Sequence, residues 1–155
     1  MLVGRCAAQP GATQGAEPLA DHDAITQLFA TYAWAHDNKE FELLDGVFTE
    51  VSDLTVDITG GATIGPLRLR QETVDFIRDT TIDQGDQRRH VITNVRFSNE
   101  SDQETRVTAI LSLFVTLDNE LTVQATGWYD CQAVLDDGAW RFASMYLTLD
   151  RTYES

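Results

Sequence analysis

The stretch that decides the fold runs from residue 106 to residue 149 and reads RVTAILSLFVTLDNELTVQATGWYDCQAVLDDGAWRFASMYLTL. Apolar and polar side chains alternate along most of it, which is the period of a β-strand with one buried face. Polar turns interrupt the alternation at Asp118-Asn119 and Asp136-Asp137-Gly138, and connections this short favour antiparallel neighbours. A further strand-like segment precedes this stretch at residues 90–97. Together they predict an antiparallel sheet with strands at residues 90–97, 106–117, 121–135 and 140–149.

The chain before this sheet begins with a predicted pair of helices. Asp21 or Asp23 can cap a helix whose inward side chains recur at three- and four-residue spacing, at Ile25, Leu28, Phe29, Tyr32 and His36. A break at Asp37-Asn38-Lys39 leads into a shorter helical segment at residues 40–48. The two segments are expected to form a helical hairpin with one buried face.

A short strand and a third helix complete the predicted elements. Residues 54–58 alternate like a strand that ends at Gly60-Gly61, and a turn around Gly65-Pro66 separates it from a helix at residues 70–80. The predicted helices precede the long antiparallel strands in the chain. This order is typical of the α+β class, in which the helices cover one face of the sheet. A curved sheet closed by three helices makes a cone.

The chain is expected to hold one folded domain. Its 155 residues suffice for a single core. Residues 1–19 are rich in Gly, Ala, Gln and Pro and have no apolar period, so they are interpreted as a flexible leader, and residues 20–155 as the domain. No stretch approaches the roughly 20 apolar residues of a membrane span.

Composition excludes several classes of partner and cofactor. A formal net charge of −14 repels nucleic acid and anionic membrane surfaces, and it favours a neutral substrate, although Arg88 and Arg89 can make a local positive site. Cys6 and Cys131 do not form a disulfide framework, which is consistent with the cytoplasm. Neither a His/Cys cluster with metal spacing nor a Gly-rich phosphate loop occurs, so no metal or other cofactor is predicted.

Several linked motifs carry a resemblance to a known family. They are the segments at residues 24–32, 35–41 (AHDNKEF), 89–94 (RHVITN), 127–130 (GWYD) and 137–142 (DGAWRF). In this order and spacing the chain resembles the SnoaL-like branch of the NTF2-like superfamily, whose members include scytalone dehydratase, bile acid 7α-dehydratase and polyketide cyclases. The resemblance implies a cone-shaped α+β barrel with a pocket between helices and sheet, in a homodimer or homotrimer. It leaves the reaction open, because one fold hosts many functions.

The resemblance also implies a catalytic pair made by Asp37 and His90. In the resembling dehydratases a histidine at the position of His90 is the general acid/base, and an aspartate at the position of Asp37 accepts a hydrogen bond from it. A carboxylate near the end of a helix meets an unfavourable dipole, so another interaction must favour Asp37 there. The alternatives are a structural histidine and an aspartate that only begins a turn.

Further candidates follow from helix and strand periods. Tyr32 and His36 are four residues apart on one helix face, and both are predicted to point inward and act with the pair, Tyr32 as a hydrogen-bond donor to a substrate carbonyl. Alternation places Tyr129 inward, and Asn94 on the face of His90. The predicted substrate-binding residues are Tyr129, Asn94, Trp128, Leu111, Leu113 and Tyr146.

One departure from the resembling dehydratases concerns the strand at residues 106–117. Those enzymes carry a second histidine or an aspartate there, whereas this strand offers Ala109, Leu111, Leu113 and Val115. A mechanism with two acid/base groups is therefore incomplete, unless His36 substitutes from the helix side.

Two functions are consistent with these observations. The first is a cofactor-independent dehydratase, isomerase or cyclase acting on a small apolar oxygenated molecule, such as a polyketide, terpenoid or steroid-like compound. The alternative is a non-catalytic ligand-binding protein, or a subunit resembling the small chain of ring-hydroxylating dioxygenases, with Trp128, Ile110 and Phe114 at a partner interface. An open cavity of about 300 Å³ or more, with His90 and Asp37 in hydrogen-bond contact, favours the enzyme.

Overall fold

A computed structural model describes residues 19–151 of the chain. The predicted leader, Leu19 excepted, and Cys6 lie outside the described residues. The elements follow in the order α1 (His22–Asn38), η1 (Phe41–Gly46), β1 (Phe48–Ile58), β2 (Thr63–Leu69), α2 (Arg70–Thr81), β3 (Gln87–Ser98), β4 (Glu104–Leu117), β5 (Glu120–Asp136) and β6 (Ala139–Leu149). The predicted α+β class is confirmed.

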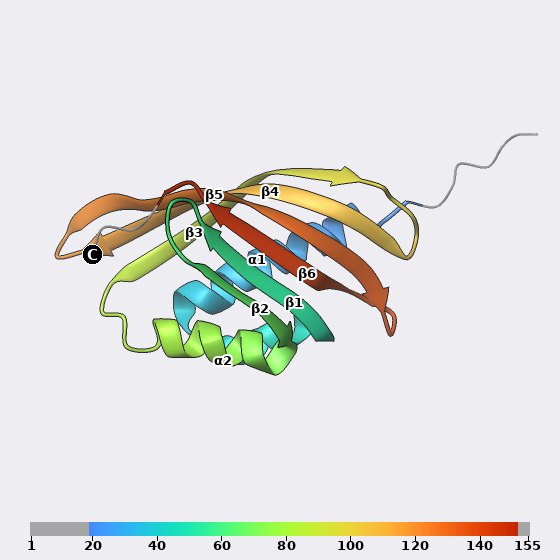
Figure 1. The fold of residues 1–155 in the computed structure, drawn as a ribbon, viewed down its shortest axis with the longest axis horizontal. Coiled ribbons are helices and arrows are strands. Elements are labelled where there is room, and N and C mark those ends of the chain that lie inside the picture. Colours follow the sequence, from blue (N-terminus) through green and yellow to red (C-terminus); the bar gives the residue numbers. More distant parts are fainter. Residues whose placement is uncertain (1–18, 152–155) are drawn as a thin grey trace, which may run out of the picture.

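All six strands of the described residues form one curved sheet. Its strand order is β2-β1-β6-β5-β4-β3, and its pairs are antiparallel except for β1 with β6, which run parallel. Both helices lie on the same side of the sheet, as Figure 1 shows, with α1 against β3 and α2 against β1 and β2. The sheet and the two helices thereby enclose a space between them. Within residues 19–151, no helix has the length and apolar character that crossing a bilayer requires.

Helix α1 begins where the sequence predicts it. The Asp21 side chain accepts a hydrogen bond from the backbone N–H of Ala24 at 2.9 Å, as an N-cap does. The helix ends two residues later than expected, because Asp37 and Asn38 still belong to its last turn and Lys39 takes the left-handed conformation (φ 61°) beyond them. Asp37 is thus held by regular helix rather than by a turn.

The residues between η1 and α2 differ most from the prediction. The helical segment expected at residues 40–48 is a 3₁₀-helix that ends at Gly46. Strand β1 begins at Phe48, well before the expected residue 54, and β2 occupies residues predicted as a turn around Gly65-Pro66. Because β2 is an edge strand, the missing N–H of Pro66 is tolerated there.

Aromatic packing joins α1 to the inner face of the sheet. The ring of Phe29 lies 4.8 Å from that of Phe142 and 5.7 Å from that of Tyr129, between centroids. All three side chains are essentially inaccessible to solvent. Aromatic pairs at these distances stabilise a core beyond the burial of their area, so these rings hold α1 against the inner face of the sheet.

Candidate active site

Asp37 and His90 form a buried pair between the last turn of α1 and strand β3. The His90 Nδ1–H donates to Asp37 Oδ1 at 2.6 Å, and the His90 backbone N–H donates to Asp37 Oδ2 at 2.9 Å. The two side chains are only 6% and 7% exposed. Because a carboxylate only accepts hydrogen bonds, it assigns the proton to Nδ1 and leaves a lone pair on Nε2. The imidazole is therefore oriented as a base.

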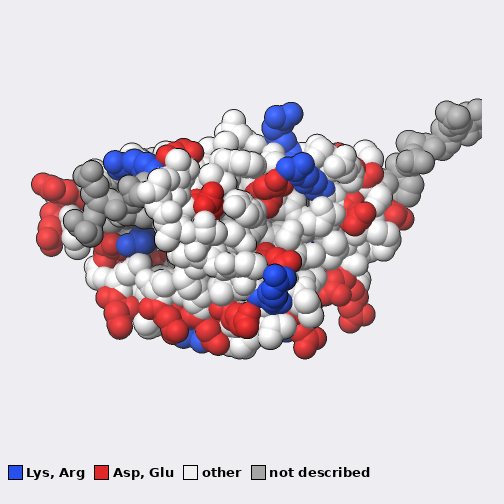
Figure 2. Space-filling model, in the orientation of Figure 1, with Lys and Arg blue, Asp and Glu red and all other residues white. Residues whose placement is uncertain are grey.

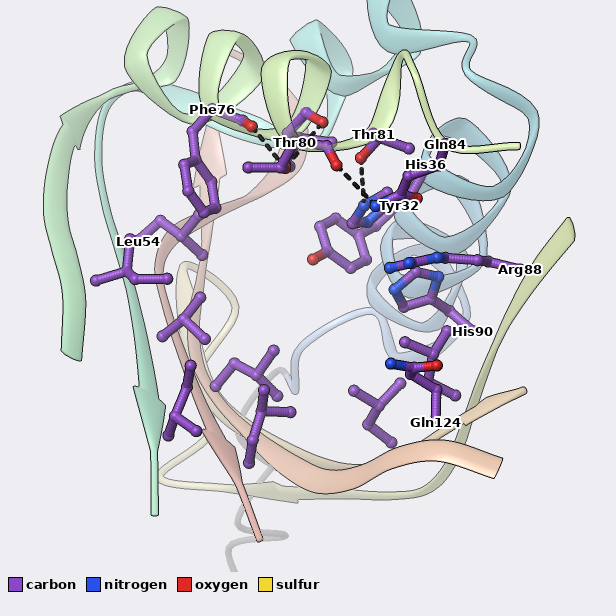
Figure 3. Close-up of a pocket in the computed structure, with 18 residues that line it drawn as sticks. Tyr32, His36, Leu54, Phe76, Thr80, Thr81, Gln84, Arg88, His90 and Gln124 are labelled. Atoms are coloured by element: carbon purple, nitrogen blue, oxygen red, sulfur yellow. Dashed lines mark hydrogen bonds between the residues drawn. The ribbon is translucent and has the colours of Figure 1, made fainter. Parts of the chain in front are cut away.

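The pair opens onto a cavity of about 340 Å³ between α1, α2 and the inner face of the sheet. Its apolar lining includes Leu54, Val56, Phe76, Leu111, Leu113 and Leu147. Figure 3 shows Leu54 and Phe76 on one side of the space and Arg88, His90 and Gln124 on the other, with the Tyr32 hydroxyl directed toward the middle. The cavity thus has an apolar wall facing a polar one.

His36 lines the cavity as a neutral imidazole. Its ring stacks on that of His90 at a centroid distance of 4.4 Å, and its Nε2 shares a hydrogen bond of 3.0 Å with Thr81 Oγ1. Burial is the main cause that lowers the pKa of His36 from 6.5 to about 3, and the electrostatic influence of the neighbouring His90 and Arg88 adds to it. Its Nδ1 is buried without a partner among the described residues, so protonation would bury an unsatisfied N–H. His36 therefore does not supply the missing second acid near neutral pH.

This neutral histidine makes stability depend on pH. The pKa of His36 is lower in the folded chain, so between about pH 6.5 and 3 the unfolded chain binds a proton that the folded chain does not, and stability falls as pH falls. We expect acidification from pH 6 to 4 to cost the wild type about 2 kcal/mol more than it costs His36→Gln. Urea denaturation of both proteins at each pH measures this difference, and parallel losses would contradict it.

Three of the predicted substrate-binding residues lie on the outer face of the sheet. Asn94 and Trp128 border an outer hollow, and Tyr146 borders another. Trp128 and Tyr146 follow the alternation of their strands, which turns them away from the cavity. Asn94 departs from it because β3 bulges there: Asn94 has φ 55°, and one extra residue separates the pairs Thr93–Ile110 and Arg96–Thr108. The structure therefore does not bring these three predicted substrate-binding residues to the cavity, and the expectation that Asn94 shares the face of His90 is wrong.

Tyr129 points inward as predicted but does not reach the cavity. It is completely buried, and its ring packs against those of Phe29 and Tyr32. The predicted residues that do line the cavity are Tyr32, His36, His90, Leu111 and Leu113. Asp37 lies behind His90, where it can act only through the imidazole.

Two polar residues of the cavity were not among the predicted site residues. Arg88 lies two positions before His90 on β3, so the period of the strand places it on the same face and could have revealed it. Gln124 is the extra residue of a bulge in β5, because Leu113 pairs with Ala125 while Phe114 pairs with Val123. The bulge turns the Gln124 side chain to the opposite face from the one that strict alternation gives it, so the period of the strand does not predict it at the cavity.

The charged surface contrasts with the cavity. Figure 2 shows acidic side chains along the edge that α2 forms, where Glu72 and Asp79 are exposed. Within the part of the chain that the structure describes, no three His, Cys, Asp or Glu side chains gather as metal ligands would. The polar groups that face the cavity are hydrogen-bonding and acid/base groups.

Comparison with known proteins identifies the family. The sequence profile of the SnoaL-like domain matches residues 17–146. The chain belongs to the SnoaL-like family. No curated protein sequence matches this SnoaL-like chain. Among solved structures it is similar to the Kfla4162 protein from Kribbella flavida, with 26% identity and a TM-score of 0.66 over 84% of this chain and 90% of that one.

Two more distant structures share the fold of this SnoaL-like protein. One is an NTF2-like protein with a cystatin-like fold from Novosphingobium aromaticivorans, with 17% identity and a TM-score of 0.69 over 84% of this chain and 82% of that one. The other is the beta subunit of a putative aromatic-ring-hydroxylating dioxygenase from the same organism, also with 17% identity and a TM-score of 0.73 over 86% and 91% of the chains. These confirm the NTF2-like fold that the motifs predicted.

Proposed function

We propose that this SnoaL-like protein is a cofactor-independent enzyme that moves a proton on a small, neutral, largely apolar and oxygenated substrate. The observation that carries the proposal is the buried Asp37–His90 pair, whose free imidazole nitrogen faces a cavity of about 340 Å³. A packed interior would have favoured a structural subunit. The cavity volume is within the range of small-molecule sites.

In the proposed reaction His90 Nε2 removes a proton from the carbon next to a carbonyl. Asp37 stabilises the imidazolium that forms, and the Tyr32 hydroxyl donates a hydrogen bond to the oxygen that gains charge. The same imidazolium then returns its proton to a leaving hydroxyl on the next carbon. The C–H and C–O bonds break, a C=C bond forms and water departs, so the step balances without an oxidant or reductant.

This order of events needs one acid/base group rather than two. It is therefore consistent with the apolar strand β4 and with a His36 that stays neutral. Returning the proton to another carbon gives isomerisation, and attack of the enolate on a second carbonyl gives cyclisation. Dehydration remains our first choice among the three. The homodimer or homotrimer and the cytoplasmic location remain predictions.

The proposal is tested with a panel of cyclic β-hydroxyketones in D₂O. We expect the wild type to release water from at least one of them and to exchange its α-proton for deuterium, which mass spectrometry and NMR detect. His90→Gln should lower this rate by about 10²- to 10⁴-fold, the usual contribution of a general base.

A matched control is His22→Gln. His22 lies at the start of α1, where its side chain forms a hydrogen bond with Glu100, and it does not line the cavity. It should retain the wild-type rate. Equal rates for His90→Gln and the wild type would rule out His90 as the base. No elimination from any β-hydroxyketone would rule out the dehydratase assignment.

A further inference from the structure

Arg88 brings hydrogen-bond donors to the polar wall of the cavity. Its Nε and Nη2 donate to the two carboxylate oxygens of Asp86 at 3.0 and 3.2 Å. Within the described residues its Nη1 has no hydrogen-bond partner, and the guanidinium lines the cavity on the same strand face as His90. Asp86 therefore holds the fork in place while leaving the Nη1 hydrogens available to a ligand.

Gln124 brings a second donor from the other side of strand β4. The bulge in β5 turns its side chain into the cavity, where the amide has no hydrogen-bond partner among the described residues. Figure 3 shows the Arg88 and Gln124 side chains on either side of the His90 ring. Strands β3 and β5 are two steps apart in the sheet, or about 10 Å, which a long Arg and a Gln side chain can span from both ends.

The balance of charge around this wall selects the kind of oxygen that fits. Arg88 is neutralised by Asp86, and Asp37 adds a negative charge behind His90. The wall thus offers donors without an excess of positive charge, which disfavours a carboxylate or phosphate. A carbonyl oxygen accepts two such hydrogen bonds and carries no net charge.

We propose that Arg88 and Gln124 form a subsite for a ketone oxygen of the substrate. This inference rests on the proposed function and narrows its substrate class to compact alicyclic or aromatic ketones. Their apolar body lies against the Leu54 and Phe76 side of the cavity, and their carbonyl lies beside the carbon that His90 deprotonates. Arg88 and Gln124 hold the ketone oxygen of the bound substrate, and the Tyr32 hydroxyl donates to that oxygen only when it gains charge in the reaction.

The test measures binding rather than turnover, with 2-tetralone and its hydrocarbon analogue tetralin as probes in ligand-observed NMR. We expect the wild type to bind 2-tetralone about tenfold more tightly than tetralin, as a hydrogen bond to a charged donor allows. Arg88→Lys keeps a cation beside Asp86 but removes the fork, and Gln124→Met removes the amide at similar size. Each should reduce the preference at least about threefold, and the double variant should abolish it, with tetralin affinity unchanged.

Matched controls are Arg96→Lys and Gln132→Met, which alter the same residue types on the outer faces of β3 and β5. Both should keep the wild-type preference. An unchanged preference in the Arg88→Lys/Gln124→Met double variant, or none in the wild type, overturns the subsite. Tighter binding of 1,2,3,4-tetrahydro-2-naphthoate than of 2-tetralone also overturns it, in favour of an anion site.

The same measurement in His90→Gln separates this inference from the proposed function. His90→Gln should keep the ketone preference while losing turnover, because the subsite does not include the imidazole. If His90→Gln retains turnover, the proposed function fails and the binding preference still reports on the subsite. If the preference is absent while His90→Gln loses turnover, only the subsite fails.

Discussion

Asp37→Asn should lower kcat by about 10²- to 10⁴-fold without unfolding the chain. Asparagine has the same shape, and its carbonyl oxygen can still accept the hydrogen bond from the His90 backbone N–H. Its amide, however, donates where the carboxylate accepted. His90 Nδ1 must then accept that bond, which moves the ring proton to Nε2 and leaves no lone pair facing the cavity.

The measurement is elimination from the β-hydroxyketone on which the wild type is most active, with folding checked by circular dichroism. Asp23→Asn is the matched control, because Asp23 lies in the first turn of the same helix, far from the cavity, and should leave kcat unchanged. A wild-type kcat in Asp37→Asn would show that His90 needs no carboxylate to select its tautomer.

Gly127→Ala should destabilise the fold by about 3 kcal/mol, near the upper end of the usual cost of overpacking. Gly127 lies in β5, opposite Leu149 of β6. A Cβ at this position would lie 2.2 Å from the carbonyl oxygen of Thr148 and 3.1 Å from the Cα of Leu149. These are backbone atoms, so no side-chain rotation relieves the overlap, and β6 itself must shift.

Urea denaturation measures this loss as a lower free energy of unfolding. Gly85→Ala provides the control, since a Cβ there meets no atom within 4 Å, and it should stay within about 0.5 kcal/mol of the wild type. Because Leu149 also lines the cavity, Gly127→Ala should weaken tetralin binding as well. A free energy of unfolding equal to that of the wild type would contradict the argument.

The spacing of apolar residues in the sequence was sufficient to predict the helices and strands that have one buried face and regular geometry. Helix α1 and strands β3 to β6 lie within a few residues of their expected bounds, because apolar side chains repeat every three to four residues or every two. The edge strand β2 was missed, since Gly65 and Pro66 are typical of turns and an edge strand accepts them only through its position in the sheet.

The site was predictable only in part for a related reason. Asp37 and His90 are 53 positions apart in the chain, and only the motifs that carry the family resemblance paired them. The bulge at Asn94 turns this predicted residue away from the cavity, and the bulge at Gln124 turns a residue that was not predicted into it. A single extra residue reverses which face a side chain occupies.

By itself, then, the sequence determined the α+β class and the inward faces of α1 and the main strands, and its family motifs pointed to Asp37 and His90 as partners, which the structure brings into hydrogen-bond contact. Only the tertiary structure decided that His36 is neutral, that Tyr129 packs instead of lining the cavity, and that Arg88 and Gln124 complete the polar wall. The reason is physical: a repeating pattern reports which face of an element is buried. The pKa of a group and the direction of a bulged side chain depend on neighbours from distant parts of the chain.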